Sequence, residues 1–213
     1  MVVKQSPDFN VTGTGDALPW TKTMWTDIPF LQGNGKKNKT KAKMLYSETG
    51  IYCLFSCEDN TLTVSMQQDL MPLWEEDVAE VFLQPDISQT HYFEYEISPL
   101  NYELPLAIFN SGGNLNRWIP FQYPDNRKTR HAVTVQGGEQ SPGASVRGWM
   151  AEFFIPYTLM EPVLEKLPVS GSTWKGNLYR IDYDHEREET LWALYKNSGN
   201  FHECENFGFF HFE

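Results

Sequence analysis

The stretch LWEEDVAEVFLQPD, residues 73–86, is the part of the sequence that decides the fold. Its second half, Val78–Gln84, is a short and mostly apolar run that fits a β-strand as well as it fits a helix. Pro85 then ends the run, because proline has no N–H to donate to a neighbouring strand. Apolar residues across the wider stretch also fit one stripe of a helix: Leu70, Leu73, Trp74, Val78, Val81 and Phe82. We therefore predict a turn of helix that ends near Trp74, followed by a strand from Val78.

Short alternating runs separated by turn residues recur along the rest of the chain, a pattern typical of a sandwich or barrel. The remaining predicted strands are Ala42–Ser47, Ile51–Cys57, His91–Ser98, Leu104–Phe109, His131–Val135, Ser145–Phe154, Asn177–Tyr183, Thr190–Tyr195 and Phe207–Phe212. Only Pro156–Leu167 has the pattern of a helix, which Pro162 keeps short. We expect an all-β fold: a sandwich of two antiparallel sheets, immunoglobulin-like or jelly-roll-like, with one short helix. No repeat or low-complexity linker divides residues 1–213, so one domain is expected.

Composition excludes several classes of function. The 213 residues include 17 lysines and arginines against 28 aspartates and glutamates, a net charge of −11, so no nucleic-acid partner is expected. No run approaches the roughly 18 apolar residues of a membrane span. The start, MVVKQSPDFN, lacks the apolar segment of a signal peptide. A secreted, periplasmic or cell-surface location would require that such a peptide had been removed, and the location is otherwise cytoplasmic.

The three cysteines, Cys53, Cys57 and Cys204, do not make a disulfide framework. Cys53 and Cys57 share one face of a predicted strand but lie about 13 Å apart along it, too far for a disulfide. We therefore expect buried thiols. Aromatic residues make up 15% of the chain, and large aromatics cover flat apolar ligands as well as filling cores. Aromatic side chains outside the core are therefore candidates for ligand binding.

Five motifs in order give the chain a resemblance to a known family. They are LWEEDVAEVFLQPD (73–86), the tyrosine-rich HYFEYEISPLNYE (91–103), GWMAEFFIP (148–156), WKGNLYR (174–180) and FGFFHF (207–212). From about Trp25 to the C-terminus the chain resembles the family 9 carbohydrate-binding modules of the DOMON-like superfamily. The resemblance implies a β-sandwich that binds sugars without catalysis, often as an accessory to a glycoside hydrolase. The implied ligand is the end of a plant-type or dietary oligosaccharide or polysaccharide, such as a glucan or xylan.

The resemblance also implies roles for particular residues. Two aromatics clamp the terminal sugar in the best-described modules; Trp74 falls on the first position and Phe201 near the second. Glu80 matches the acceptor of sugar hydroxyls. Where the family has an arginine on the tyrosine-rich strand, this chain has Glu94 or Tyr95. Together with the residues themselves, the resemblance gives a predicted carbohydrate-binding set of Trp74, Glu80, Glu94, Arg180 and Phe201.

Each of these residues also has a structural interpretation. Trp74 follows Pro72 and precedes three acids, a polar setting that favours a sugar-stacking indole over one that caps the core. Phe201 lies in a polar loop, where an aromatic either faces a ligand or anchors the loop. Glu80 either lines a groove or is buried with a partner, and both interpretations require a positive neighbour. Arg180 is the candidate partner.

The acidic run around Asp182 and Asp184 suggests a metal site. Its oxygens are of the kind that Ca²⁺ uses, and some members of the resembled family contain calcium. The alternative is a solvated acidic loop. No other cofactor is expected.

Two other functions use residues of the same regions. A glycoside hydrolase needs two carboxylates about 5–9.5 Å apart, for which Glu76, Asp77, Glu80 and Glu94 are candidates. Other DOMON-like domains hold haem through Met and His, so a haem site would draw on Met66, Met150, His91 and His131. Trp118, predicted to lie in a loop, either extends a binding surface or anchors that loop.

Overall fold

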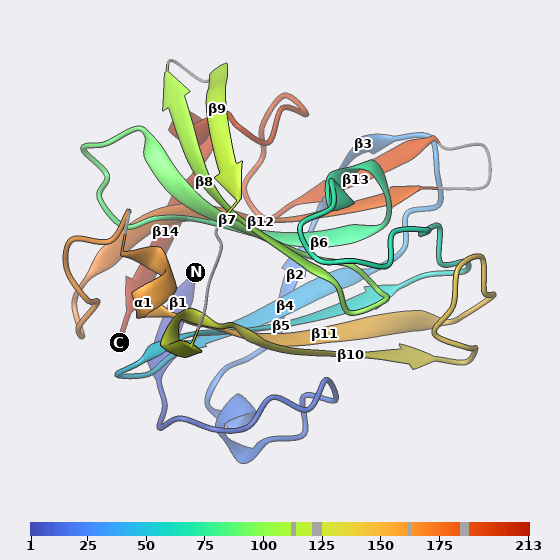
Figure 1. The fold of residues 1–213 in the computed structure, drawn as a ribbon, viewed down its shortest axis with the longest axis horizontal. Coiled ribbons are helices and arrows are strands. Elements are labelled where there is room, and N and C mark those ends of the chain that lie inside the picture. The colour runs from blue at the N-terminus through green and yellow to red at the C-terminus, as the bar shows by residue number, and fades with distance from the viewer. Residues whose placement is uncertain (112–113, 121–124, 162, 184–187) are drawn as a thin grey trace.

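The computed structural model describes residues 1–111, 114–120, 125–161, 163–183 and 188–213, and it shows two facing β-sheets (Figure 1). In the first sheet, β13 (Glu189–Ala193) pairs with the end of β12 (Thr173–Tyr183), and β3 (Phe30–Gly33) pairs with β13. The strands of this sheet are β14 (Gly208–Phe212), β12 (Thr173–Tyr183), β6 (Val78–Gln84), β7 (His91–Ile97), β8 (Glu103–Ser111), β9 (Asn114–Pro120), β13 (Glu189–Ala193) and β3 (Phe30–Gly33).

The second sheet is the lower layer of Figure 1. Its strands are β10 (Arg130–Gln136), β11 (Gly148–Pro156), β5 (Gly50–Glu58), β4 (Thr40–Tyr46) and β2 (Thr26–Ile28). All of these pair antiparallel. Strand β1 (Val2–Gln5) joins the two sheets, because its first half pairs in parallel with β14 and its second half with β4. The β-sandwich expected from the sequence is confirmed.

The helical segments are short. They are α1 (Tyr157–Met160) and the 3-10 turns η1 (Leu18–Lys22), η2 (Leu73–Glu75), η3 (Asp125–Arg127) and η4 (Cys204–Asn206). The predicted turn before β6 is confirmed as η2. The helix predicted over Pro156–Leu167 is much shorter, because Pro156 belongs to β11 and the apolar side chain of Val163 reaches the core from a turn after α1. Across the described part of the chain, no helix has the length and apolar character needed to cross a membrane.

The main core lies between the sheets, where both layers contribute inward-pointing side chains. Tyr95 of β7 stacks on Phe153 of β11 with ring centroids 4.6 Å apart. Cys53 and Cys57 are buried in this core as free thiols, as predicted, and burial raises the pKa of Cys57 to about 12. The N-terminal segment covers the outer face of the second sheet, where the Trp20 indole donates to Glu152 Oε1 at 2.7 Å (Figure 1).

The outer face of the first sheet carries its own apolar cluster. On β6, Ala79, Val81 and Leu83 point into the core between the sheets, while Val78 and Phe82 belong to this outer cluster. Glu80 has the same parity as Val78 and Phe82 and therefore lies on the outer face. Every residue of β6 is buried, which shows that both faces of the strand are covered. A cavity opens within this outer cover.

Candidate functional site

A cavity of about 310 Å³ lies on the outer face of the first sheet. It brings together four residues predicted to bind carbohydrate: Trp74, Glu80, Glu94 and Phe201. Strand residues line it from the sheet, while η2, β9 and the segment 199–202 supply the rest. The other lining residues are Phe82, Leu106, Ile108, Leu115, Trp118, Ile181, Gly199, Asn200 and His202.

Two indoles form the more accessible part of this lining. Trp74, on η2, is half-buried, and Trp118, on β9, is 43% exposed. Their rings meet edge to face, with centroids 5.6 Å apart and planes at 69°. The Tyr183 hydroxyl donates to the Trp74 carbonyl at 3.1 Å and holds η2 over the sheet. Trp118 belongs to β9 and so lies on a strand rather than in the predicted loop. Its contact with Trp74 extends the aromatic surface of the cavity.

Phe201 lines the cavity but is mostly covered. It is 8% exposed, and its ring stacks on Tyr179 with centroids 3.9 Å apart and planes at 9°. The Tyr179 hydroxyl donates to the Phe201 carbonyl at 3.0 Å. One ring face is therefore occupied within the protein, so Phe201 supports the wall, and the exposed indole opposite Trp74 is that of Trp118.

The loop that carries Phe201 is held in place by its own hydrogen bonds. The Asn197 side chain donates to the Tyr179 hydroxyl at 3.2 Å, and the Ser198 amide donates to Glu203 Oε2 at 3.0 Å. Gly199, which lines the cavity, has φ of +105°, a conformation that other residues rarely adopt. These contacts indicate a cavity whose shape exists before a ligand arrives.

His202 closes one side of the cavity as a neutral side chain. Its Nδ1 shares a hydrogen bond of 2.7 Å with the Tyr92 hydroxyl, and its ring stacks on Phe82 at 5.6 Å. Burial lowers the pKa of His202 to about 4, so the imidazole is uncharged at neutral pH. His202 Nδ1 also lies 3.9 Å from Glu94 Oε2, but an uncharged ring provides no ion pair there.

Three glutamates share the sheet beneath the cavity. Glu80 of β6 lies directly across from Glu96 of β7, and Glu94 is two residues from Glu96 on the same face. All three are buried. Burial, together with the neighbouring carboxylates, raises the pKa values of Glu80 and Glu96 well above their usual range. Burial raises the pKa of Glu94 to about 8.

The structure does not bring Arg180 to this site. Arg180 points to the opposite face of β12, where its guanidinium contacts Asp59 at 3.2 Å and Asp182 at 2.9 Å. It also donates to the Glu58 carbonyl at 2.6 Å and lies 4.9 Å from the Trp192 ring centroid. The expected pairing of Arg180 with Glu80 is therefore wrong. Alternate residues of a strand point to opposite faces, and Arg180 points between the sheets whereas Glu80 points to the outer face.

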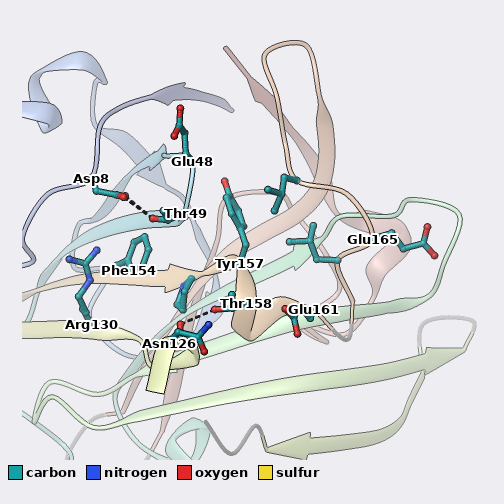
Figure 2. A pocket seen from close by; sticks show the side chains of 13 residues that line it. Asp8, Glu48, Thr49, Asn126, Arg130, Phe154, Tyr157, Thr158, Glu161 and Glu165 are labelled. Carbon is teal, nitrogen blue, oxygen red and sulfur yellow. Dashed lines mark hydrogen bonds between the residues drawn. The ribbon is translucent and has the colours of Figure 1, made fainter. Parts of the chain in front are cut away.

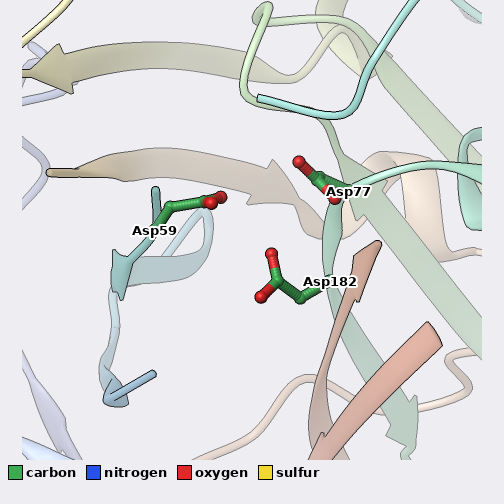
Figure 3. Close-up of side chains that lie close together, drawn as sticks. All are labelled: Asp59, Asp77 and Asp182. Carbon is green, nitrogen blue, oxygen red and sulfur yellow. The ribbon is translucent and has the colours of Figure 1, made fainter. Parts of the chain in front are cut away.

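Asp182 belongs to a cluster of carboxylates between the sheets. Oxygens of Asp59, Asp77 and Asp182 lie within 4.8 Å of one another (Figure 3). Asp77 accepts the amides of Thr63 and Tyr183 at 2.6 and 2.8 Å, while Asp59 and Asp182 accept from Arg180. The cluster does not fit the expected Ca²⁺ site, because N–H donors and a guanidinium already hold its oxygens. Asp184, the other expected ligand, lies outside the described residues.

The residues considered for haem lie apart. Met66 packs in the outer cluster of the first sheet, whereas Met150 packs on the outer face of the second. His131 contacts Asn101 at 2.9 Å and Glu103 at 3.5 Å, and His91 packs on Phe109. No haem pocket joins these four described residues.

A second cavity, of about 570 Å³, lies beside β11 and α1 (Figure 2). The Arg130 guanidinium covers the Phe154 ring at 4.2 Å, and the Thr49 hydroxyl donates to Asp8 at 2.8 Å. Its aromatic residues Phe154 and Tyr157 are buried. This cavity is larger, but it offers little free ring surface, and none of the residues predicted from the sequence lines it.

Comparisons with known proteins agree with the fold and with the resemblance. A family model described as "Carbohydrate family 9 binding domain-like" matches residues 11–113, just under half of the chain, which confirms the resemblance to the family 9 modules. The matched segment includes η2, β6 and β7, and thus Trp74, Glu80 and Glu94. No curated protein matches the chain at a significant level.

Solved structures match over the full chain. A provisionally assigned carbohydrate-binding protein from Bacteroides uniformis ATCC 8492 has 16% identity and a TM-score of 0.81, with 100% of this chain and 98% of the other covered. A family 9 carbohydrate-binding module from Caldicellulosiruptor kristjanssonii in complex with cellotriose has 15% identity and a TM-score of 0.71, with 100% and 93% covered. Its complex with glucose has 15% identity, a TM-score of 0.70, and 100% and 95% covered. At these identities the likeness shows the fold.

Proposed function

We propose that this chain binds carbohydrate without catalysis and receives the end of an oligosaccharide or polysaccharide in the cavity that Trp74 and Trp118 line together. The observation that carries the proposal is the pairing of an accessible aromatic surface with buried carboxyl groups in one preformed cavity. A sugar ring has apolar C–H faces and a rim of hydroxyls, so it needs both kinds of partner. The confirmed family resemblance supports the same function.

The size of the cavity favours the end of a sugar chain. Ligand pockets range from about 300 to 1,000 Å³, and this one, at about 310 Å³, has the volume for one or two sugar rings. The ligands named for the Caldicellulosiruptor structures, glucose and cellotriose, make a glucan end the first candidate, with xylan next. An accessory role beside a glycoside hydrolase belongs to the same proposal.

The test is a calorimetric titration of the full chain with glucose, cellotriose and a xylotriose, repeated for Trp74→Ala. We expect weak binding of at least one of these sugars, reduced about tenfold or more in Trp74→Ala, since a lost stacking contact contributes on the order of 1–3 kcal/mol. Trp25→Ala is the matched control, because Trp25 is also half-buried but packs near β4 of the other sheet. Equal heats for Trp74→Ala and the parent chain would contradict the proposal.

One observation favours a second function, glycoside hydrolysis. A general acid needs a raised pKa, and burial raises that of Glu94 to about 8, within the range that such an acid requires. Incubation with aryl β-glucosides and aryl β-xylosides distinguishes the two functions. Turnover that is lost in Glu94→Gln would show that the chain is a glycoside hydrolase. Binding without release of the aryl alcohol supports the non-catalytic function proposed above.

A further inference from the structure

The three glutamates under the cavity form an incomplete electrostatic arrangement. Like charges directly across from each other on neighbouring strands are destabilising, and Glu80 faces Glu96 in that way. Among the described residues, Glu94 Oε2 and both carboxylate oxygens of Glu96 are buried and lack a well-aligned hydrogen-bond donor, and their nearest polar neighbours are each other and the backbone at Trp74. Buried carboxylates are normally paired with a cation or held by several N–H donors. Here the three glutamates form no ion pair with a described lysine or arginine, and burial instead raises the pKa values and favours the uncharged form.

The described residues around the cavity supply no cation. Among the described residues that line it, none is lysine or arginine, and the only imidazole, that of His202, is uncharged at neutral pH. Glu80 and Glu94 both line the cavity, so a group that enters it meets these two side chains. The missing partner is therefore one that a ligand can bring.

We propose that the ligand of this cavity is an amino sugar, whose ammonium group is held by Glu80 and Glu94 while its ring lies against Trp74 and Trp118. This inference rests on the proposed carbohydrate binding and adds the class of sugar. The ammonium provides charge-assisted hydrogen bonds to the two carboxylates. The same cation is attracted to the faces of nearby indoles, so the aromatic and acidic parts of the lining select the same ligand.

The arrangement makes binding of an ammonium group depend on pH. When the cavity is empty, burial favours the protonated form of the three glutamates by raising their pKa values, and an entering cation favours the ionised form instead. Other titratable groups lie near the three glutamates: His202, Tyr92 and Tyr179, with Tyr183 and Glu75 at the edge of η2. Strand β9 adds no titratable group to the described lining, to which it contributes Trp118 and Leu115. Glucosamine affinity should therefore rise with pH until the amine of the sugar loses its own proton.

The test compares three sugars that differ only at one ring position: glucosamine, glucose and N-acetylglucosamine. The full chain is titrated with each at about pH 6.5, where the amine is protonated, in two buffers with different ionisation enthalpies. We expect glucosamine to bind about tenfold or more tightly than the two uncharged sugars, because charge-assisted hydrogen bonds are about twice as strong as neutral ones. Only glucosamine should release protons into the buffer.

Two variants identify the groups responsible. Glu94→Gln and Glu80→Gln keep the side-chain shape and remove the charge, so each should reduce the preference for glucosamine over glucose to within about threefold. Glu75→Gln is the matched control, since Glu75 is exposed beside Trp74 but does not line the cavity, and it should keep the preference. A preference that survives both cavity variants would overturn the assignment.

The remaining outcomes separate the two proposals. Binding of glucose or cellotriose with no advantage for glucosamine overturns the amino-sugar inference and leaves the proposed function in place. Binding of none of the sugars overturns both. Calcium chloride alone is the third probe: if it competes with glucosamine and releases the same protons, the glutamates are a metal site and the amino-sugar inference is wrong.

Discussion

Two buried groups of carboxylates lie on opposite faces of the first sheet, and only one of them contains its cation. Between the sheets, Asp59 and Asp182 hold Arg180 at 3.2 and 2.9 Å. On the outer face, Glu80, Glu94 and Glu96 have no lysine or arginine among the described residues of the cavity beside them. The inner cluster is complete within the protein, whereas Glu80 and Glu94 of the outer one line a cavity. The difference separates a structural network from the proposed binding site.

The largest expected effect concerns the inner cluster. Arg180→Met leaves buried carboxylates without their cation, so we expect the free energy of unfolding to fall by about 3–5 kcal/mol. Urea denaturation followed by fluorescence measures it. Arg147→Met, at an exposed position, is the control and should change stability by less than about 0.5 kcal/mol. Equal stability of Arg180→Met and the parent chain would show that the inner network is not structural.

The pH dependence of stability distinguishes the clusters. The pKa of Glu94 is raised from 4.5 to about 8, so the stability it contributes is present below about pH 4.5 and is lost as the pH rises through 8. Burial raises the pKa of Asp182 only to about 6, so its contribution to stability changes mostly below that pH. Burial lowers the pKa of His202 from 6.5 to about 4, so the stability that His202 contributes is present above about pH 6.5. The window above pH 6.5 therefore reports on the glutamates and on Asp77, whose pKa is also raised.

Between about pH 6.5 and 8 we expect the parent chain to lose about 1–2 kcal/mol more stability than Glu94→Gln, since one proton contributes about 1.4 kcal/mol for each pH unit. Urea denaturation of both chains across this range provides the comparison. Parallel stability curves for the two chains would mean that Glu94 is already ionised in the folded protein.

Trp118 gives a third contrast, between binding and stability. Because Trp118 is 43% exposed on β9, Trp118→Ala should leave the free energy of unfolding within about 1 kcal/mol of the parent value. Sugar affinity should nevertheless fall about tenfold, as for an aromatic that contacts the ligand. Calorimetry and urea denaturation of the same sample measure both. A loss of stability without a loss of affinity would make Trp118 a structural residue.

The smallest expected effect is at Gly199. With φ of +105°, Gly199→Ala introduces backbone strain of about 1 kcal/mol and brings the new Cβ against Gln32, which should weaken sugar binding about threefold. Gly171→Ala is a close control, because Gly171 also has a positive φ, of +91°, but lies in open space. It should reduce stability without affecting sugar affinity. Equal affinities for the two variants would contradict a preformed loop.

The strands of the sandwich could be predicted from the sequence because their alternation is strong. Val78–Gln84 was predicted with the bounds it has, since Glu80 and Phe82 share one face and Pro85 ends the run. Strands β1, β2, β3 and β9 were missed, being short or, in β9, largely polar. The extent of α1 was also wrong, because helical spacing over so few residues does not distinguish a helix from a turn whose apolar side chains reach the core.

The candidate site could be predicted in part. Trp74, Glu80, Glu94 and Phe201 do line one cavity, although their role in binding stays a prediction. The prediction for Arg180 was wrong because alternate residues of a strand face opposite sides, and its neighbours Tyr179 and Ile181 both lie in the outer cluster. Glu96 follows from Glu94 by the period of two. The contribution of Trp118 depends on the β8–β9 pairing, a long-range contact that no local pattern reveals.

The most direct test of the central claim is a crystal structure of the full chain grown with a high concentration of glucose. We expect one pyranose ring in the cavity over β6 and β7, against the surface that Trp74 and Trp118 form together, with hydroxyls within hydrogen-bond distance of Glu80 and Glu94. Glucose bound elsewhere, for example beside Arg130 in the larger cavity, with the cavity over β6 and β7 left empty, would contradict the account.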